Sequence, residues 1–400
     1  LVRVVLNSEV SLVFAILSSI LTAVLFGNSF AVLIFAFLTS LSGAHWVRHV
    51  TERSSLFRAG LRLGLFNSVL LFALHLTTSR PFDLQLLYKL GFGFTGGLAA
   101  AVMVTGIVPL VESLFRYTTN IKLLELANMN NPLLRDLMVQ APGTYHHSII
   151  VGNLAEAAAE NIGVNPLMAR VAAYYHDIGK IRKPQYFIEN IGGQENRHDK
   201  LAPSMSALIL MAHVKDGVEM ARESRLGQAL TDIIRQHHGT SLMKFYYDRA
   251  KSKADPEVEQ IDERDYRYHG PKPQTREAAL IMLADAIEAA SRTLTDPTPA
   301  RIQGMVQKII NNIFIDGQLD ECELILKDID NIAKSFKLVL GGIFHYRVDY
   351  PEPVSKERSL EKPTGSLNED RDRKSTEEPE DQQDSTAKGG TEDLKRLGMS

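Results

Sequence analysis

The stretch Ala-Tyr-Tyr-His-Asp-Ile-Gly-Lys, residues 173–180, places a histidine and an aspartate side by side as His176 and Asp177. Upstream, Asn165 and Pro166 are typical of the N-cap and first position of a helix. The apolar residues that follow recur at helical spacing, and His176 continues their face. The pattern therefore predicts a helix that directs the imidazole of His176 into the core, with Asp177 in its last turn.

Other ionisable residues fall on the apolar faces or at the ends of further predicted helices. One such helix ends at Gly163, one covers residues 203–214, and one stops at Gly239, while Gly179 is expected to end the helix of His176 in a left-handed conformation. The residues brought inward in this way are His147, His213, His237, His238 and Asp285.

Several inward-facing ionisable groups together indicate a metal site. A single buried histidine is usually satisfied by a backbone carbonyl, but buried charged or polar groups are costly unless they are paired or coordinated. Imidazole and carboxylate ligands suit zinc, iron, manganese or nickel, whereas calcium takes more oxygen ligands. The single cysteine, Cys322, excludes a thiolate cage.

The order His, His-Asp, Asp, with Asp-Ile-Gly-Lys at 177–180, resembles the HD phosphohydrolase superfamily. The additional histidines, with the motifs Gly-Thr-Tyr-His-His-Ser and Arg-Gln-His-His-Gly-Thr, are similar to those of membrane-bound cyclic di-AMP phosphodiesterases of the PgpH type. The likeness spans residues 116–344. It implies hydrolysis of cyclic di-AMP to linear pApA at a two-metal site. The alternatives are another nucleotide substrate such as cyclic di-GMP, or a receptor that binds nucleotide without cleaving it.

The resemblance also implies roles for individual residues. Two divalent metals, iron or manganese in this family, would share Asp177 as a bridging ligand, and Lys180 would neutralise charge on the phosphate unless it is an ordinary surface lysine. His198 and Lys200 would line the substrate groove or cap the next helix, and His269 stands where the family has a proline. The first metal would be held by His147, His176 and Asp285, and the second by His213, His237 and His238, with substrate contact as the alternative for His238.

The N-terminal part of the chain is mostly apolar and predicts membrane helices. A hydrocarbon layer of ~30 Å is crossed by an apolar helix of roughly 20 residues, and a buried helical hairpin is the alternative for the first pair of runs. The overall net charge of −3 gives no reason to expect a nucleic-acid polymer as partner. The four runs cover residues 11–26, 30–47, 61–76 and 87–111.

Basic residues in the short loops predict the orientation in the lipid bilayer. The loop after the second run carries four arginines, whereas the next loop has only Arg80 and Lys89. We therefore expect the arginine-rich loop and everything after the last span to be cytoplasmic, in a multi-pass protein of the cell membrane. In that last span, Gly93 and Gly97 form a Gly-x-x-x-Gly step that serves either internal packing or a homodimer.

The whole chain is thus predicted to be all-α. We expect about four transmembrane helices in residues 1–113, a connector in 114–143 and an α-helical HD bundle in 144–350. The polar residues 351–400 cannot bury a core and are expected to form a disordered tail. The connector is predicted to contain short helices over 121–128 and 132–140, and the bundle to end with helices over 299–315 and 320–340. Because the chain begins with Leu1, it is expected to lack an N-terminal part of the family's architecture.

Overall fold

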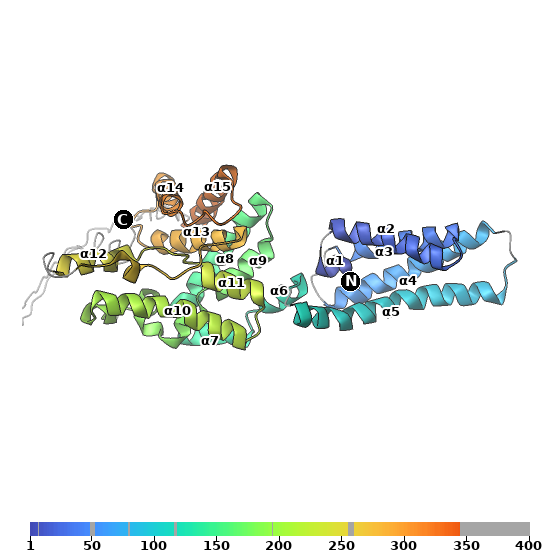
Figure 1. Ribbon diagram of the computed structural model, residues 1–400, viewed down its shortest axis with the longest axis horizontal. Helices are drawn as coiled ribbons and strands as arrows, with labels where there is room; N and C mark the ends of the chain where they lie inside the picture. Colours follow the sequence, from blue (N-terminus) through green and yellow to red (C-terminus); the bar gives the residue numbers. More distant parts are fainter. Residues whose placement is uncertain are drawn as a thin grey trace, which may run out of the picture.

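The computed structural model describes residues 1–6, 8–48, 53–78, 81–115, 118–193, 195–254 and 260–344. Within these ranges the chain forms helices and one isolated antiparallel bridge, between Leu242 and Arg267, so the all-α prediction is confirmed. The predicted disordered tail, residues 351–400, lies outside the described residues. Figure 1 shows two helical parts joined end to end through α6.

The first part contains the predicted apolar helices. A short α1 (Val2–Val5) is followed by α2 (Ser8–Leu25), α3 (Phe30–Trp46), α4 (Arg53–Leu76) and α5 (Leu84–Phe115). Three of them, α2, α4 and α5, have the length and hydropathy to cross a membrane, whereas α3 is shorter. Many of their large apolar side chains, such as Leu25 and Phe92, face outward, as expected for contact with lipid. The protein is therefore a membrane protein.

Glycines let α4 and α5 approach closely. A Cβ atom on Gly97 would lie 2.3 Å from the backbone nitrogen of Gly64 and 2.7 Å from the carbonyl oxygen of Gly60. Gly97 therefore serves the packing of two helices of the same chain, which is one of the two roles expected for the Gly-x-x-x-Gly step. Beside this contact the side chain of Asn67 accepts a hydrogen bond from Thr39 of α3 at 3.0 Å.

The connector consists of α6 (Asn120–Leu126) and α7 (Pro132–Gln140), close to the predicted ranges. The side chains of Thr119 and Asn131 cap their N-termini by accepting hydrogen bonds from backbone N–H groups. The apolar residues Leu123, Leu126, Leu134 and Leu137 are fully or almost fully buried against the second part. The connector is thus packed into the bundle.

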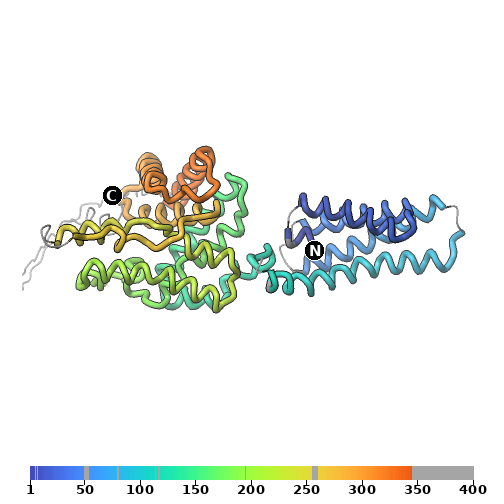
Figure 2. Tube along the Cα trace, viewed as in Figure 1, coloured from blue at the N-terminus to red at the C-terminus, as the bar shows by residue number. Residues whose placement is uncertain are grey.

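The second part is a helical bundle (Figure 2). Its core is shared by α8, α9 and α13. Each of these helices is rich in alanine, for example Ala155, Ala172 and Ala284, which are fully buried and let the helices lie close together.

The final helices begin and end near the predicted residues, although α15 starts later than expected. The α-helices are α8 (Pro142–Ile162), α9 (Pro166–Tyr175), α10 (Pro203–Glu223), α11 (Gln228–Gln236), α12 (Lys244–Lys253), α13 (Arg276–Ser291), α14 (Pro299–Ile315) and α15 (Leu326–Ile343), and the 3-10 helices are η1 (Ile178–Arg182), η2 (Pro184–Tyr186), η3 (Ile188–Asn190), η4 (Arg197–Lys200) and η5 (Glu263–Tyr266).

Two predictions about helix ends in this region are wrong. Gly179 is not left-handed but lies inside η1, and α10 continues through Gly217 to Glu223 instead of ending near residue 214. The reason is a close backbone contact: a Cβ on Gly179 would lie 1.9 Å from the carbonyl oxygen of His213 and 2.5 Å from the nitrogen of Gly217. By contrast, Gly163 ends α8 in the left-handed conformation, as predicted.

Candidate metal centre

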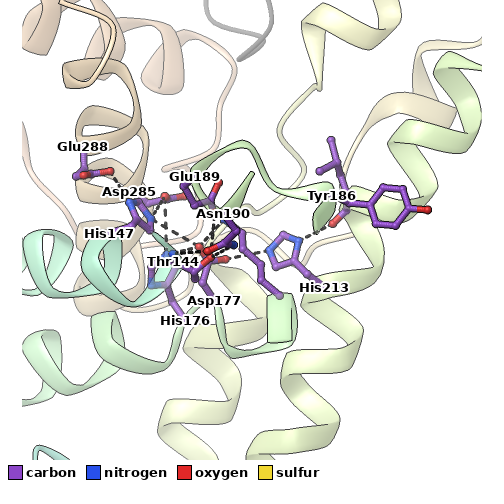
Figure 3. A network of polar contacts seen from close by, with 12 residues as sticks. Thr144, His147, His176, Asp177, Tyr186, Glu189, Asn190, His213, Asp285 and Glu288 are labelled. Carbon is purple, nitrogen blue, oxygen red and sulfur yellow. Dashed lines mark hydrogen bonds and ion pairs between the residues drawn. The ribbon is translucent and has the colours of Figure 1, made fainter. Parts of the chain in front are cut away.

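The seven residues predicted as metal ligands come together from five segments of the bundle. His147 lies in the second turn of α8, and His176 and Asp177 directly follow α9. His213 lies within α10, while His237 and His238 directly follow α11. Asp285 lies in the middle of α13. Figure 3 shows His147, His176 and His213 turned toward Asp177.

These side chains form two groups that share one carboxylate. Within each group, one ligand atom per residue lies within 4.8 Å of all the others. The Oδ2 atom of Asp177 is 3.2 Å from Nε2 of His176, while its Oδ1 atom is 3.3 Å from Nε2 of His213. Each oxygen of Asp177 therefore faces a different group. The groups are His147, His176, Asp177 and Asp285, and Asp177, His213, His237 and His238.

The helices themselves select the ring nitrogen that each histidine presents. Nδ1 of His176 donates to the carbonyl of Ala173 at 2.7 Å, and Nδ1 of His237 donates to that of Ile234 at 2.7 Å. His213 makes the same contact three residues back, with Leu210. Because a nitrogen that faces a carbonyl carries a proton, Nε2 is the nitrogen of each ring that faces Asp177 and can bind a metal once it is deprotonated.

His147 is oriented by a carboxylate instead of a carbonyl. Its Nδ1 hydrogen bonds with Glu288, whose other oxygen accepts a hydrogen bond of 2.7 Å from Arg292. A carboxylate behind a ligand histidine fixes the ring and raises its basicity. The sequence analysis missed Glu288, although it lies three residues after Asp285 and so shares that face of α13.

The donor set fits a pair of divalent cations. Nε2 of His147, Nε2 of His176 and Oδ1 of Asp177 are buried without a hydrogen-bond partner and lie close together, whereas Oδ2 of Asp177 forms an ion pair with Lys180. Leaving such atoms unpaired in a protein interior is costly, and coordination would satisfy all of them. The chemistry of these donors, imidazole and carboxylate, suits transition-metal ions.

Electrostatics favours the metal-binding protonation states at several of these groups. Burial opposes ionisation of Asp177, but the charge of Lys180 and the neighbouring His176 outweigh it and hold the pKa of Asp177 well below its usual value. The pKa of Asp285 is held low in the same way, against burial, by contacts with His147 and His176. Burial, reinforced by His237, lowers the pKa of His238 well below its usual value. Ionised carboxylates and neutral imidazoles are the forms that bind metal.

His147 and His176 behave differently because they lie beside carboxylates. Burial lowers the pKa of His147, but contacts with Asp285 and Glu288 overcome it and the net shift is upward. The pKa of His176 is also raised against burial, chiefly by Asp177. A cation that binds these two imidazoles would therefore have to displace protons, which couples metal binding to pH.

Lys180 is buried beside the shared carboxylate and is not a surface lysine. Its Nζ atom lies 2.7 Å from Oδ2 of Asp177 and 2.9 Å from Oε1 of Glu189, and its side chain is only 13% exposed. Glu189 also accepts a hydrogen bond of 2.9 Å from Thr144. The sequence analysis did not identify this support for Lys180, and the catalytic role of Lys180 stays a prediction.

A cavity of about 1320 Å³ opens over the two groups. His198 lines it, held by a 2.8 Å hydrogen bond from Nε2 to the carbonyl of Tyr186, and its Nδ1 is buried without a partner. Tyr268, which the sequence analysis did not single out, stacks on His238 with ring centroids 4.2 Å apart. Lys200 does not line the cavity: its side chain is 72% exposed and pairs with Glu195. His198 thus lies on the cavity wall and Lys200 does not, and their contacts with substrate stay predictions.

Comparison with known proteins agrees with this geometry. Residues 1–119 match the family model described as 7TM receptor with intracellular HD hydrolase, and residues 144–290 match that of the HD domain. The cyclic-di-AMP phosphodiesterase PgpH of Bacillus subtilis (strain 168) is 40% identical over 363 residues, which are 89% of this chain and 50% of the relative. The protein of the same name from Listeria monocytogenes serotype 1/2a (strain 10403S) is 40% identical over 358 residues, 88% of this chain and 49% of the relative.

Solved structures resemble the second part of the chain. The crystal structure of the L. monocytogenes phosphodiesterase PgpH HD domain in complex with cyclic-di-AMP is 47% identical, with a TM-score of 0.51. The match covers 55% of this chain and 100% of that one. The structure without that ligand is 46% identical, again with a TM-score of 0.51, and the match covers 54% of this chain and 100% of that one.

Fold and site together define an HD-domain metalloprotein attached to membrane helices. The chain belongs to the PgpH-type family of 7TM receptors with an intracellular HD hydrolase. It spans about half the length of the curated relatives that it matches.

Proposed function

We propose that this chain hydrolyses cyclic di-AMP to linear pApA at a two-metal centre and so lowers the level of a second messenger. The observation that carries the proposal is the position of Asp177, whose two oxygens face two separate groups of histidines. Bound divalent cations in such a pair supply Lewis acidity and a nucleophile derived from water.

Individual residues of the chain have separate proposed roles in binding the metals and the phosphate. Asp177 would be shared by the two cations, and His147, His176 and Asp285 would hold the first of them. The second would be held by His213, His237 and His238. Lys180 keeps a positive charge beside Asp177, where it offers an electrostatic partner to the phosphate, and Glu189 holds it there. Iron or manganese is the proposed metal pair, by resemblance to the family; imidazole ligands suit iron, and carboxylate ligands suit manganese.

Support for the substrate comes from the relatives' printed names and from the cavity. Two relatives are named cyclic-di-AMP phosphodiesterases, and a solved HD domain is described in complex with that nucleotide. The aromatic rings of Tyr186 and Tyr246 line the cavity next to His198, and that of Tyr268 lines it next to His238. Such rings offer stacking surfaces for nucleobases. We therefore assign His198 to the substrate side of the site.

We also propose that residues 144–350 form a cytoplasmic HD domain, joined by a connector over 114–143 to the membrane region 1–113. The arginine-rich loop before the third predicted span is the reason for this orientation. A homodimer through the membrane helices would have to use a face other than the one around Gly97, which packs against α4.

Purified full-length chain, supplied with manganese or iron, tests the activity. We expect cyclic di-AMP to be cleaved, and cyclic di-GMP and simple nucleotides to be cleaved far more slowly. The matched variants are His147→Ala, which removes a ligand, and His146→Ala, which changes the exposed neighbour on the same helix. Turnover should be lost only in the first. Faster cleavage of cyclic di-GMP, or binding of cyclic di-AMP without cleavage, would contradict the proposed function.

A further inference from the structure

The helix that leads into His176 is hydrogen bonded at both of its ends to the connector. At the start of α9, the amide of Asn165 donates to the side-chain oxygen of Asn120 at 3.2 Å. At its end, the hydroxyl of Tyr175 donates to the backbone carbonyl of Leu126 at 2.8 Å. Asn120 and Leu126 are the first and last residues of α6, so each end of α6 is hydrogen bonded to one end of α9.

The bond made by Tyr175 lies in the core. Tyr175 is fully buried, and Leu126 is almost so. The carbonyls in the last turn of a helix have no partner within that helix, so the hydroxyl of Tyr175 satisfies a group that burial would otherwise leave unpaired. Because Tyr175 directly precedes His176, this bond fixes the backbone of α9 one residue before the metal-ligand pair.

The same connector helix contacts the membrane part. Thr119, the N-cap of α6, donates from its hydroxyl to Glu112 near the end of α5. Thr119 is 1% exposed, whereas Glu112 is half-buried, so this contact is partly shielded from solvent. Ile121 of α6 lines a small cleft together with Leu56 of α4 and Pro109 of α5. Figure 1 shows α6 between the two helical parts.

We infer that Tyr175 is a positioning residue through which α6 sets the place of His176, so that movement of α4 and α5 reaches the metal centre. The chain of contacts runs from Glu112 to Thr119, through α6, and from Leu126 to Tyr175. It does not require Tyr175 to touch substrate or metal. The inference rests on the proposed metal site, and it adds to that site a route by which the membrane part controls it.

Two tyrosines at adjacent positions in α9 provide a matched pair for the test. Tyr175→Phe removes the hydroxyl that reaches α6. Tyr174→Phe removes a hydroxyl that is bonded only within α9, where it accepts from Arg170 at 2.9 Å. Each full-length variant is loaded with manganese and exposed to a chelator, and the metal that remains on the protein is measured over time by mass spectrometry, beside the thermal unfolding midpoint.

We expect Tyr175→Phe to lose metal about tenfold faster than the parent chain, as is typical when a residue that orients a ligand indirectly is removed. Its kcat should fall while KM for cyclic di-AMP stays unchanged, and Tyr174→Phe should match the parent. Metal loss that is unchanged in Tyr175→Phe, or equally faster in both variants, would overturn the inference. If the parent chain retained its metal but cleaved no cyclic di-AMP, the proposed substrate would be wrong. The comparison of metal loss between Tyr175→Phe and Tyr174→Phe would still test the inference.

A double-variant cycle tests the upstream link and remains informative if Tyr175→Phe is poorly stable. Thr119→Val removes the bond to Glu112 and should accelerate metal loss in the parent chain but not in the Tyr175→Phe chain. Independent effects in the two backgrounds would overturn the relay. Asn165→Asp keeps the side-chain oxygen that caps α9 but loses the N–H donor to Asn120. Because the link between α6 and the start of α9 is then broken, this variant should also lose metal faster.

Discussion

Gly179→Ala is the substitution that most directly tests how the metal centre is held together. The added Cβ atom would lie 1.9 Å from the carbonyl oxygen of His213 and 2.5 Å from the nitrogen of Gly217. Both obstacles are backbone atoms, so no side chain can rotate away. η1 and α10 must therefore separate, and they carry Lys180 and His213, respectively.

The size of the effect follows from that overlap. An ordinary van der Waals contact needs at least 3.4 Å, so η1 and α10 must move apart by about 1.5 Å at His213. Overpacking of this kind typically costs about 1–3 kcal/mol of stability. A misplacement of about 1 Å at a catalytic centre lowers turnover by about 100-fold, and we expect a loss of at least that size. The second metal should also bind more weakly, because His213 belongs to its ligand group.

The assay combines cyclic di-AMP turnover, metal content and thermal unfolding of the full-length chain. Gly304→Ala is the control, because Gly304 lies in α14 with nothing within 4 Å of the added atom. That variant should keep its turnover and gain up to about 1 kcal/mol from the better helix propensity of alanine. Wild-type turnover and metal content in Gly179→Ala would refute the idea that this backbone contact positions His213.

Asp177→Ala should abolish turnover and deplete both metals, because each ligand group loses its shared carboxylate; two tightly held ions per purified chain would show that Asp177 is not the bridge. Glu288→Gln should weaken metal binding by about 10- to 100-fold in a chelator competition, because His147 loses the charged acceptor at Nδ1. An unchanged affinity would mean that Glu288 does not tune His147. In a chain without its native cysteine, a cysteine at Thr78 should react with an impermeant thiol reagent in intact cells, whereas one at Thr51 should not. The opposite labelling would invert the proposed topology.

The inward direction of the histidines could be predicted because it depends on helical phase alone. His147 and His213 follow the apolar residues of their own helices at regular steps, and His176 continues the apolar face of α9. The structure brings all three together around Asp177. The positions of most helices were predictable for the same reason, since proline and asparagine signals mark their starts.

The contacts between segments could not be read from local patterns. Gly179 follows the apolar face of α9 and so resembles a helix stop, yet its real constraint is the backbone of α10, which lies more than thirty residues further along the chain. The same contact gives Gly217 a packing function inside α10, which is longer than the predicted range 203–214. Glu288 and Glu189 were missed because an acidic residue on a helix is usually a solvated one, and only the fold brings these two to His147 and Lys180.

The division between local and distant information follows the chemistry of the ligands. In His176, His213 and His237, Nδ1 faces the carbonyl three residues earlier in the chain. The tautomer of these histidines therefore depends only on local helical structure, which the sequence predicts. His147 depends on Glu288, 141 residues away, and its basicity is therefore set by how α8 packs on α13. A change in how α8 packs on α13 would alter the ligand group that contains His147. It would leave the tautomers of His213 and His237, in the other group, unchanged. The first group, which includes His176 at the end of the helix tied to the connector, is thus the more sensitive of the two to movements elsewhere in the protein.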